Sequence, residues 1–383
     1  MAKKQSDKLS IEAVNLDNKS DVRRFIRVPW SIYANDPLWV PPLVLERHQH
    51  LSPRNPYFQH ARLKAWVAVR DGQAVGRIST QIDELHQARY GDTTGFFGLL
   101  EAIDDEAVFA ALFDVAGNWL REQGMRRIRG PFSLSINDES GLLVEGFETP
   151  PYIMMSHAPR YYAQRLEELG FEKVKDLLAY VIHPTYETPK VVTTLMARAN
   201  RRIRVRPLKR SRFDEELGIL QDIFEDAWSE NWGFIPFTAE EFAEVGKNLK
   251  LLVDEELVQI AEVDGAPGAM MVTFPNVNEA IRDLNGSLFP LGWLKLLWRL
   301  KVTGVKTGRI ALMGVRKRYQ NSLLGSALAF SVIEATRPPV IRQGIREVEM
   351  SWILEDNKGM RRILETIGAR VSKRYRIYEK SVS

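Results

Sequence analysis

Residues 310–329 combine an apolar run, a basic turn and the expected start of a helix. The apolar run ends at Val315, three cations follow at 316–318, and the helix is expected to open near Ser322. A strand that leads into a helix through a short turn presents free backbone N–H groups and the positive end of the helix dipole, which together bind phosphate. Adjacent cations favour a polyanionic ligand. The segment predicts a phosphate site, although an ordinary strand–turn–helix unit has the same outline.

The same segment resembles the acyl-CoA pyrophosphate loop of the GNAT (Gcn5-related N-acetyltransferase) superfamily, whose usual form is Gln/Arg-x-x-Gly-x-Gly/Ala. Gln320 and Gly325 occupy two positions of that pattern, whereas Leu323 stands where the family has its first glycine. The resemblance implies that acyl-CoA is the co-substrate, held by the strand end, the turn and the first helical turn. The residues implied are Met313, Gly314, Val315, Arg316, Arg318, Tyr319, Gln320, Asn321, Ser322, Leu323, Leu324, Gly325 and Ser326.

A segment near the C-terminus has the spacing of a second GNAT pattern, Asn-x-x-Ala-x-x-Leu-Tyr-Glu-Lys-Leu-Gly-Phe. The resemblance implies that Asn357 helps to position the CoA arm. The family's usual general acid, a tyrosine, falls on Leu364, which cannot transfer a proton. Any acid must then come from elsewhere, and the nearest tyrosines in the sequence are Tyr319, Tyr375 and Tyr378. A phenol with an ordinary pKa near 10 can protonate a departing thiolate.

The order of expected strands and helices occurs twice along the chain. Each pass contains two apolar runs around an Asp-Gly turn, at residues 71–72 and 264–265, which is a hairpin signal. This order predicts a mixed α/β (α+β) chain with two GNAT-like domains, residues 1–190 and 191–383, each a largely antiparallel sheet flanked by helices. Residues 101–106 of the first domain include four acidic side chains, so we expect that domain to lack a phosphate loop. Two unrelated α/β domains are the alternative.

Two loops concentrate aromatic and polar side chains outside the expected elements. They suit an amphipathic acceptor, although surface loops that only pack against their own domain have the same composition. The candidate acceptor-binding residues are Asn137 and Tyr161 in one loop and Trp228, Asn231, Trp232 and Phe234 in the other.

An amine acceptor must lose a proton before it attacks a thioester. Glu139 and His157 are the candidate bases, and Tyr319 and Tyr375 complete the set of candidate catalytic residues. The six histidines are scattered without the spacing of metal ligands, so no metal is expected.

Composition narrows the class of protein. The 383 residues include no cysteine, which excludes disulfides and thiolate chemistry. The net charge of +4 is too small to indicate a nucleic-acid partner. The sequence has no apolar run of about 18 residues and no apolar segment near its start, so we expect a cytoplasmic protein.

One basic window points to an anionic surface. No acidic residue lies between Asp283 and Glu334, and residues 288–301 form an apolar stretch with two tryptophans and several cations. A helix of this kind lies on membrane interfaces. It also fits a lid over an acyl chain, or a helix packed on its own domain.

Nearly the whole chain resembles a bacterial family of tandem GNAT-like proteins, relatives of which are linked to ceramide synthesis. The resemblance implies an acyl-CoA-dependent N-acyltransferase acting on a small-molecule or lipid amine, such as a long-chain base. The degraded positions Leu323 and Leu364 leave a second class open: a non-catalytic module that binds CoA, lipid or a protein partner.

Overall fold

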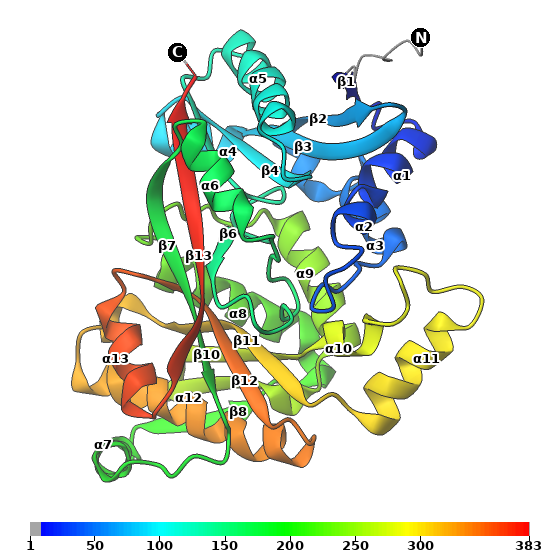
Figure 1. Ribbon diagram of the computed structural model, residues 1–383. Coiled ribbons are helices and arrows are strands. Elements are labelled where there is room, and N and C mark those ends of the chain that lie inside the picture. Colours follow the sequence, from blue (N-terminus) through cyan, green and yellow to red (C-terminus); the bar gives the residue numbers. More distant parts are fainter. Residues whose placement is uncertain (1–8, 383) are drawn as a thin grey trace, which may run out of the picture. The chain divides into compact units, whose positions relative to one another are not determined.

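A computed structural model describes residues 9–382, which fold into two compact units (Figure 1). Unit 1 comprises residues 9–176, 281–292 and 375–382, and unit 2 comprises residues 177–280 and 293–374. Two of the crossings between units fall inside strands, because β7 (Glu172–Ile182) and β13 (Arg370–Ser381) each give one end to each unit. The expected boundary after residue 190 coincides with the start of α7 (Lys190–Ala199), a helix of unit 2.

The sheet of unit 1 follows the order β1-β2-β3-β4-β5-β13. Its pairs are antiparallel except for the parallel pair β4–β5. The Asp-Gly turn between β2 and β3 has positive φ at both residues, Asp71 and Gly72, which matches the twist of a tight hairpin. The strands are β1 (Leu9–Ala13), β2 (Ala61–Arg70), β3 (Gln73–Asp83), β4 (Thr94–Ala102) and β5 (Arg127–Gly130), with the short β6 (Leu142–Glu145) in the same unit.

The helices of unit 1 begin with a correction. We expected one helix over residues 22–34, but the structure has two, because Pro29 lacks the N–H that would continue the first. The long amphipathic helix α5 packs on β2, β3 and β4. The helices are α1 (Lys19–Arg27), α2 (Pro29–Ile32), α3 (Val44–His50), the 3₁₀ turn η1 (Pro56–Gln59), α4 (Glu84–Tyr90), α5 (Glu106–Glu122) and α6 (Tyr161–Glu168).

The sheet of unit 2 follows the order β7-β12-β11-β10-β9-β8, with β11 and β12 parallel and the other pairs antiparallel. Its second Asp-Gly turn, Asp264 and Gly265, repeats the positive φ values of the first hairpin. The strands are β8 (Ile203–Pro207), β9 (Val258–Val263), β10 (Ala266–Pro275), β11 (Thr307–Val315) and β12 (Glu347–Leu354).

The long helix α12 packs on β8, β9, β10 and β11. It runs beyond the expected end at residue 336, through Pro338 and Pro339, and Gly344 with φ +77 follows it as a C-terminal stop. The helices are α7, η2 (Arg210–Arg212), α8 (Phe213–Trp228), α9 (Ala239–Leu252), η3 (Glu255–Leu257), α10 (Val277–Ile281), α11 (Gly292–Trp298), the π-helical turn η4 (Arg299–Thr303), η5 (Lys317–Tyr319), α12 (Leu323–Arg342) and α13 (Lys358–Thr366).

Each sheet contains one parallel pair whose register is short. In unit 1 the β4–β5 register ends at Phe96 and Arg129, and in unit 2 the β11–β12 register ends at Ile310 and Met350. Beyond these points β4 and β11 continue while their partners diverge. The mixed sheets flanked by helices confirm the expected fold class.

Candidate functional site

The strand–turn–helix of unit 2 forms as expected. After β11 the chain makes the 3₁₀ turn η5, and Asn321 takes a left-handed φ of +56 before the helix begins. The Ser322 side chain caps α12 by accepting a hydrogen bond of 3.0 Å from the backbone N–H of Gly325. One of the free N–H groups at this helix end is thus already bonded to the chain's own hydroxyl.

Gly325 is needed for the shape of this turn. A Cβ atom at this position would lie 2.1 Å from the backbone oxygen of Tyr319. The turn and the first helical turn therefore touch through backbone atoms. By contrast, Leu323, at the first glycine position of the GNAT pattern, is 74% exposed and points away from that contact.

Three carboxylates of α8 and the loop after it face the basic turn. Asp222 forms an ion pair with Arg316, and Glu230 lies 2.7 Å from the Lys317 amine. Asp226 accepts a hydrogen bond of 2.7 Å from the backbone N–H of Lys317. The cationic run seen along the sequence is thus partly neutralised in the fold, and one phosphate-binding amide is occupied by a carboxylate.

The end of β11 offers backbone donors on one side. Residues Met313 to Val315 pair with β10, while the register with β12 has already ended at Ile310. In an antiparallel strand alternate N–H groups point to opposite edges. Some of these N–H groups therefore point toward the edge where β12 has diverged, which is the geometry needed to polarise a thioester carbonyl. Trp228 packs over Gly314, where a Cβ would lie 2.2 Å from the indole.

A buried acid lies on β12 beside this divergence. Glu349 accepts a hydrogen bond of 2.8 Å from the Ser351 hydroxyl, which in turn accepts one of 2.9 Å from Arg309. Burial raises the pKa of Glu349 to about 7, although the Arg309 charge and the Ser351 hydrogen bond oppose that rise. The other carboxylate oxygen, Oε2, has no hydrogen-bond partner. Glu349 can therefore exchange a proton near neutral pH.

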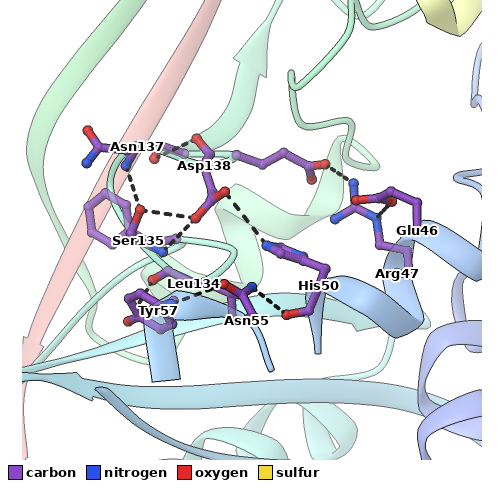
Figure 2. Close-up of polar contacts among 12 residues, drawn as sticks. Glu46, Arg47, His50, Asn55, Tyr57, Leu134, Ser135, Asn137 and Asp138 are labelled. Atoms are coloured by element: carbon purple, nitrogen blue, oxygen red, sulfur yellow. Dashed lines mark hydrogen bonds and ion pairs between the residues drawn. The ribbon is translucent and has the colours of Figure 1, made fainter. Parts of the chain in front are cut away.

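Unit 1 contains a larger polar network around α3 and the loop after β5 (Figure 2). Arg47 forms ion pairs with Glu46 at 3.0 Å and with Glu139. His50 points toward Asp138, at 3.7 Å. Burial would raise the pKa of Asp138, but the His50 contact and hydrogen bonds from Ser135 bring it below its usual value.

A second buried acid lies at the end of β4. Glu101 accepts hydrogen bonds of 2.8 Å from the hydroxyls of Tyr33 and Tyr162, and Arg77 lies 3.9 Å away. Burial raises the pKa of Glu101 to about 7 against the opposing attraction of Arg77. Burial also lowers the pKa of Arg77, which donates to the carbonyl of Phe25 at the C-terminal end of α1.

His157 is held beside this acid by two neighbours. Its Nε2 lies 2.7 Å from a carboxylate oxygen of Asp36, and its carbonyl accepts a hydrogen bond from Tyr33. Burial would raise the pKa of Asp36, but the bond to His157 holds it below its usual value. A carboxylate that orients an imidazole in this way favours proton acceptance by the ring.

Comparison with solved structures identifies the fold. The chain covers 98% of its length and 99% of the other chain in an alignment with a tandem GNAT protein from the clavulanic acid biosynthesis pathway, with a TM-score of 0.57 and 13% identity. Both units therefore have the GNAT fold. A scan against protein-family models found no match.

Two curated proteins are far more similar in sequence. Protein YghO of Escherichia coli (strain K12) is 54% identical over 366 residues, 95% of this chain and 94% of that protein. Bacterial ceramide synthase of Caulobacter vibrioides (strain NA1000 / CB15N) is 44% identical over 380 residues, 98% of this chain and 99% of that protein. The chain belongs to this family of tandem GNAT-type acyltransferases.

Within this acyltransferase, the motif residues near the C-terminus have structural partners. The Asn357 side chain caps α13 by accepting a hydrogen bond of 3.0 Å from the N–H of Met360. Leu364, in the place of the usual tyrosine, is fully buried. Of the candidate acids, Tyr319 lies in the turn of unit 2, whereas Tyr375 is fully buried in the part of β13 that belongs to unit 1.

The candidate acceptor residues of the acyltransferase lie in both units. In unit 2, Phe234 is buried and packs with Trp228 around Phe224, and the loop N–H of Asn231 bonds the Trp228 carbonyl at 2.7 Å. Trp232 is half-buried in the same loop.

In unit 1, the Tyr161 hydroxyl donates to the carbonyl of Ala102 at 2.7 Å, and the backbone N–H of Asn137 donates to the Ser135 hydroxyl at 3.0 Å. These two, with Glu139 and His157, place four of the sequence-derived residues in one unit.

Sequence reasoning missed Glu101, Glu349 and Asp226. The two glutamates lie in apolar strand patterns, and only an unexpected acid in such a pattern signals them. Asp226 belongs to a helix whose acidic face looked solvated, and no local signal connects it with a turn ninety-one residues away. No helix within residues 9–382 is long and apolar enough to cross a membrane.

Proposed function

We propose that this protein transfers the acyl group of an acyl-CoA to the primary amine of a long-chain base. The thioester C–S bond breaks, an amide C–N bond forms, CoA leaves as the thiol and the amine loses a proton. The observation that carries the proposal is the 44% identity over 98% of the chain to a protein named bacterial ceramide synthase, because a ceramide is an N-acylated long-chain base.

Unit 2 supports acyl-CoA as the donor. Its turn and the N-terminus of α12 suit the pyrophosphate, and the unpaired edge of β11 suits the thioester carbonyl. Arg318 is the exposed cation of the turn, and its guanidinium lies 4.7 Å from the centre of the Tyr319 ring. We propose that Arg318 and the helix N-terminus together hold the CoA phosphates.

The acceptor amine needs a base that works near neutral pH. Unit 2 supplies Glu349, and unit 1 supplies Glu101 and the His157–Asp36 pair. Glu139 is less suited, because its ion pair with Arg47 favours a carboxylate that is already engaged.

Thiol release is the direct test. The purified protein is mixed with acetyl-, myristoyl- or palmitoyl-CoA and sphinganine, and free thiol and the amide product are both measured. We expect product with sphinganine, and none with N-acetylsphinganine, whose amine is blocked. Release of thiol with lysine but not with sphinganine would overturn the assignment of a lipid acceptor.

A non-catalytic module is the second candidate, and one observation favours it. Carboxylates of Asp222, Asp226 and Glu230 face the turn that should bind pyrophosphate, and they repel an anion. Measurable acyl-CoA binding without thiol release for any amine would support this candidate and exclude the transferase.

A further inference from the structure

The helix α11 and the turn η4 present an apolar face to solvent. Four large apolar side chains on successive outward positions are 42–60% exposed: Trp293, Leu294, Leu297 and Trp298. Val302, in η4, is 60% exposed. We call these five residues the α11 face. Figure 1 shows α11 at the outer edge of unit 2, away from α8 and α12.

The inner side of the same helix is attached to unit 2. Leu296 and Leu300 are partly buried, and Arg299 donates a hydrogen bond of 2.8 Å to the carbonyl of Ala280. This arrangement corrects the expected distribution, in which Lys295 and Arg299 would form the polar face. The outward side is the apolar one, and an exposed contiguous apolar patch marks a contact surface.

The charge around the α11 face selects its partner. Lys295 and Lys301 are exposed beside the apolar residues, and the chain has no acidic residue from 284 to 333. Glu279 is the carboxylate nearest to the end of η4, and it accepts hydrogen bonds from the backbone N–H groups of Lys306 and Thr307. Tryptophans at an apolar face flanked by lysines are typical of helices that lie on anionic bilayers.

We propose that the α11 face inserts into the interface of an anionic lipid bilayer. Trp293, Leu297 and Trp298 enter the boundary between headgroups and acyl chains, while Lys295 and Lys301 contact lipid phosphates. This inference concerns where the protein works and does not require acyl transfer. It places a lipid-binding helix in the unit that carries the candidate acyl-CoA loop.

Vesicle flotation with the full chain tests the proposal. We expect the wild-type protein to float with vesicles of equimolar phosphatidylcholine and phosphatidylglycerol, and to float much less with phosphatidylcholine alone. The double variant Leu297→Ser/Trp298→Ser should lose roughly tenfold or more in binding, because two large apolar side chains no longer enter the interface. Lys295→Gln/Lys301→Gln should weaken binding only to the anionic vesicles and reduce its dependence on salt.

Two exposed apolar residues on other helices of unit 2 provide matched controls. Leu251 in α9 is 68% exposed and Val191 in α7 is 66% exposed, so Leu251→Ser and Val191→Ser remove similar exposed surface. We expect both controls to float like the wild type.

Three results would overturn the proposal: no flotation of the wild-type protein with anionic vesicles, equal loss in the controls, or a concentration-dependent dimer that Trp298→Ser abolishes. The last would assign the α11 face to a second copy of the chain. Because acyl transfer is assayed separately on detergent-solubilised substrate, failure of flotation and failure of catalysis are distinguishable.

Discussion

The two units share the GNAT order of elements but treat the divergence of their parallel strands differently. In unit 1 the space beyond Phe96 is closed by the chain itself: Phe132 donates a hydrogen bond of 2.8 Å to the carbonyl of Phe97. Gln81 holds the same segment by donating to the carbonyls of Phe132 and Leu134. In unit 2 the register ends at Ile310 and is followed by a helix-capping turn that carries exposed Arg318.

The polar residues differ in the same way. Unit 1 binds its charged groups to one another, as in the pairs Arg47–Glu139 and Asp36–His157. Unit 2 keeps its buried acid, Glu349, with one oxygen unpartnered. The comparison teaches that one fold can be duplicated while only one copy keeps a ligand-binding edge and the other keeps the scaffold.

The largest effect is expected where unit 1 closes on itself. A Cβ at Gly98 would lie 1.7 Å from the carbonyl oxygen of Phe132, so Gly98→Ala must displace backbone. We expect it to lower the free energy of unfolding by about 3 kcal/mol or more in chemical denaturation. Gly117→Ala in α5, where the nearest atom is a side-chain carbon 3.5 Å away, is the control and should be near neutral. Equal stability of the two variants would mean that the closure is not tight.

The two buried acids should give matching pH dependences. Glu349 has a pKa of about 7 in the folded protein against about 4.5 when exposed, so the folded state binds its proton more tightly. This group therefore makes the free energy of unfolding fall as pH rises from about 4.5 to about 7, by about 3 kcal/mol in total, and then level off.

Glu349→Gln and Glu101→Gln should each remove their share of that slope, measured by denaturant unfolding between about pH 5 and pH 8. The variant that also flattens the pH dependence of kcat identifies the unit that supplies the base. An unchanged slope in either variant would contradict the burial argument for that unit.

The third prediction concerns the turn of unit 2. Gly325→Ala would push a methyl group to 2.1 Å from the Tyr319 carbonyl and displace the turn. We expect acyl-CoA affinity, measured by calorimetry, to fall by roughly tenfold or more with a smaller loss of stability than Gly98→Ala. In Gly359→Ala the nearest listed neighbour atom lies 3.8 Å away, and binding should be retained. Unchanged affinity in Gly325→Ala would place the CoA elsewhere.

The smallest effect is expected from the carboxylate beside the turn. Asp226→Asn keeps an oxygen that can accept from the Lys317 N–H, at 2.7 Å in the wild type, but removes a negative charge. We expect acyl-CoA to bind a few times more tightly, with the gain largest at low salt. Glu225→Gln, one residue away on α8, is the control. Weaker binding in Asp226→Asn would mean that Asp226 shapes the site rather than opposes the ligand.

Local signals in the sequence were enough for most elements. The Asp-Gly turns at 71–72 and 264–265 and the strand–turn–helix at 310–329 formed as expected, because turn chemistry and hydrophobic periodicity act over a few residues. Errors arose where a neighbour decided the outcome, as when Pro29 divided the first helix and α12 continued to Arg342.

By itself, the sequence determined the GNAT family, the repeated order of elements and the position of the candidate CoA loop. Only the tertiary structure decided which charges meet: Asp226 with the Lys317 amide, Glu101 with Tyr33 and Tyr162, and Arg309 with Ser351. The physical reason is that a pKa and an ion pair depend on burial and on partners distant in the chain. Periodicity along the sequence contains neither quantity.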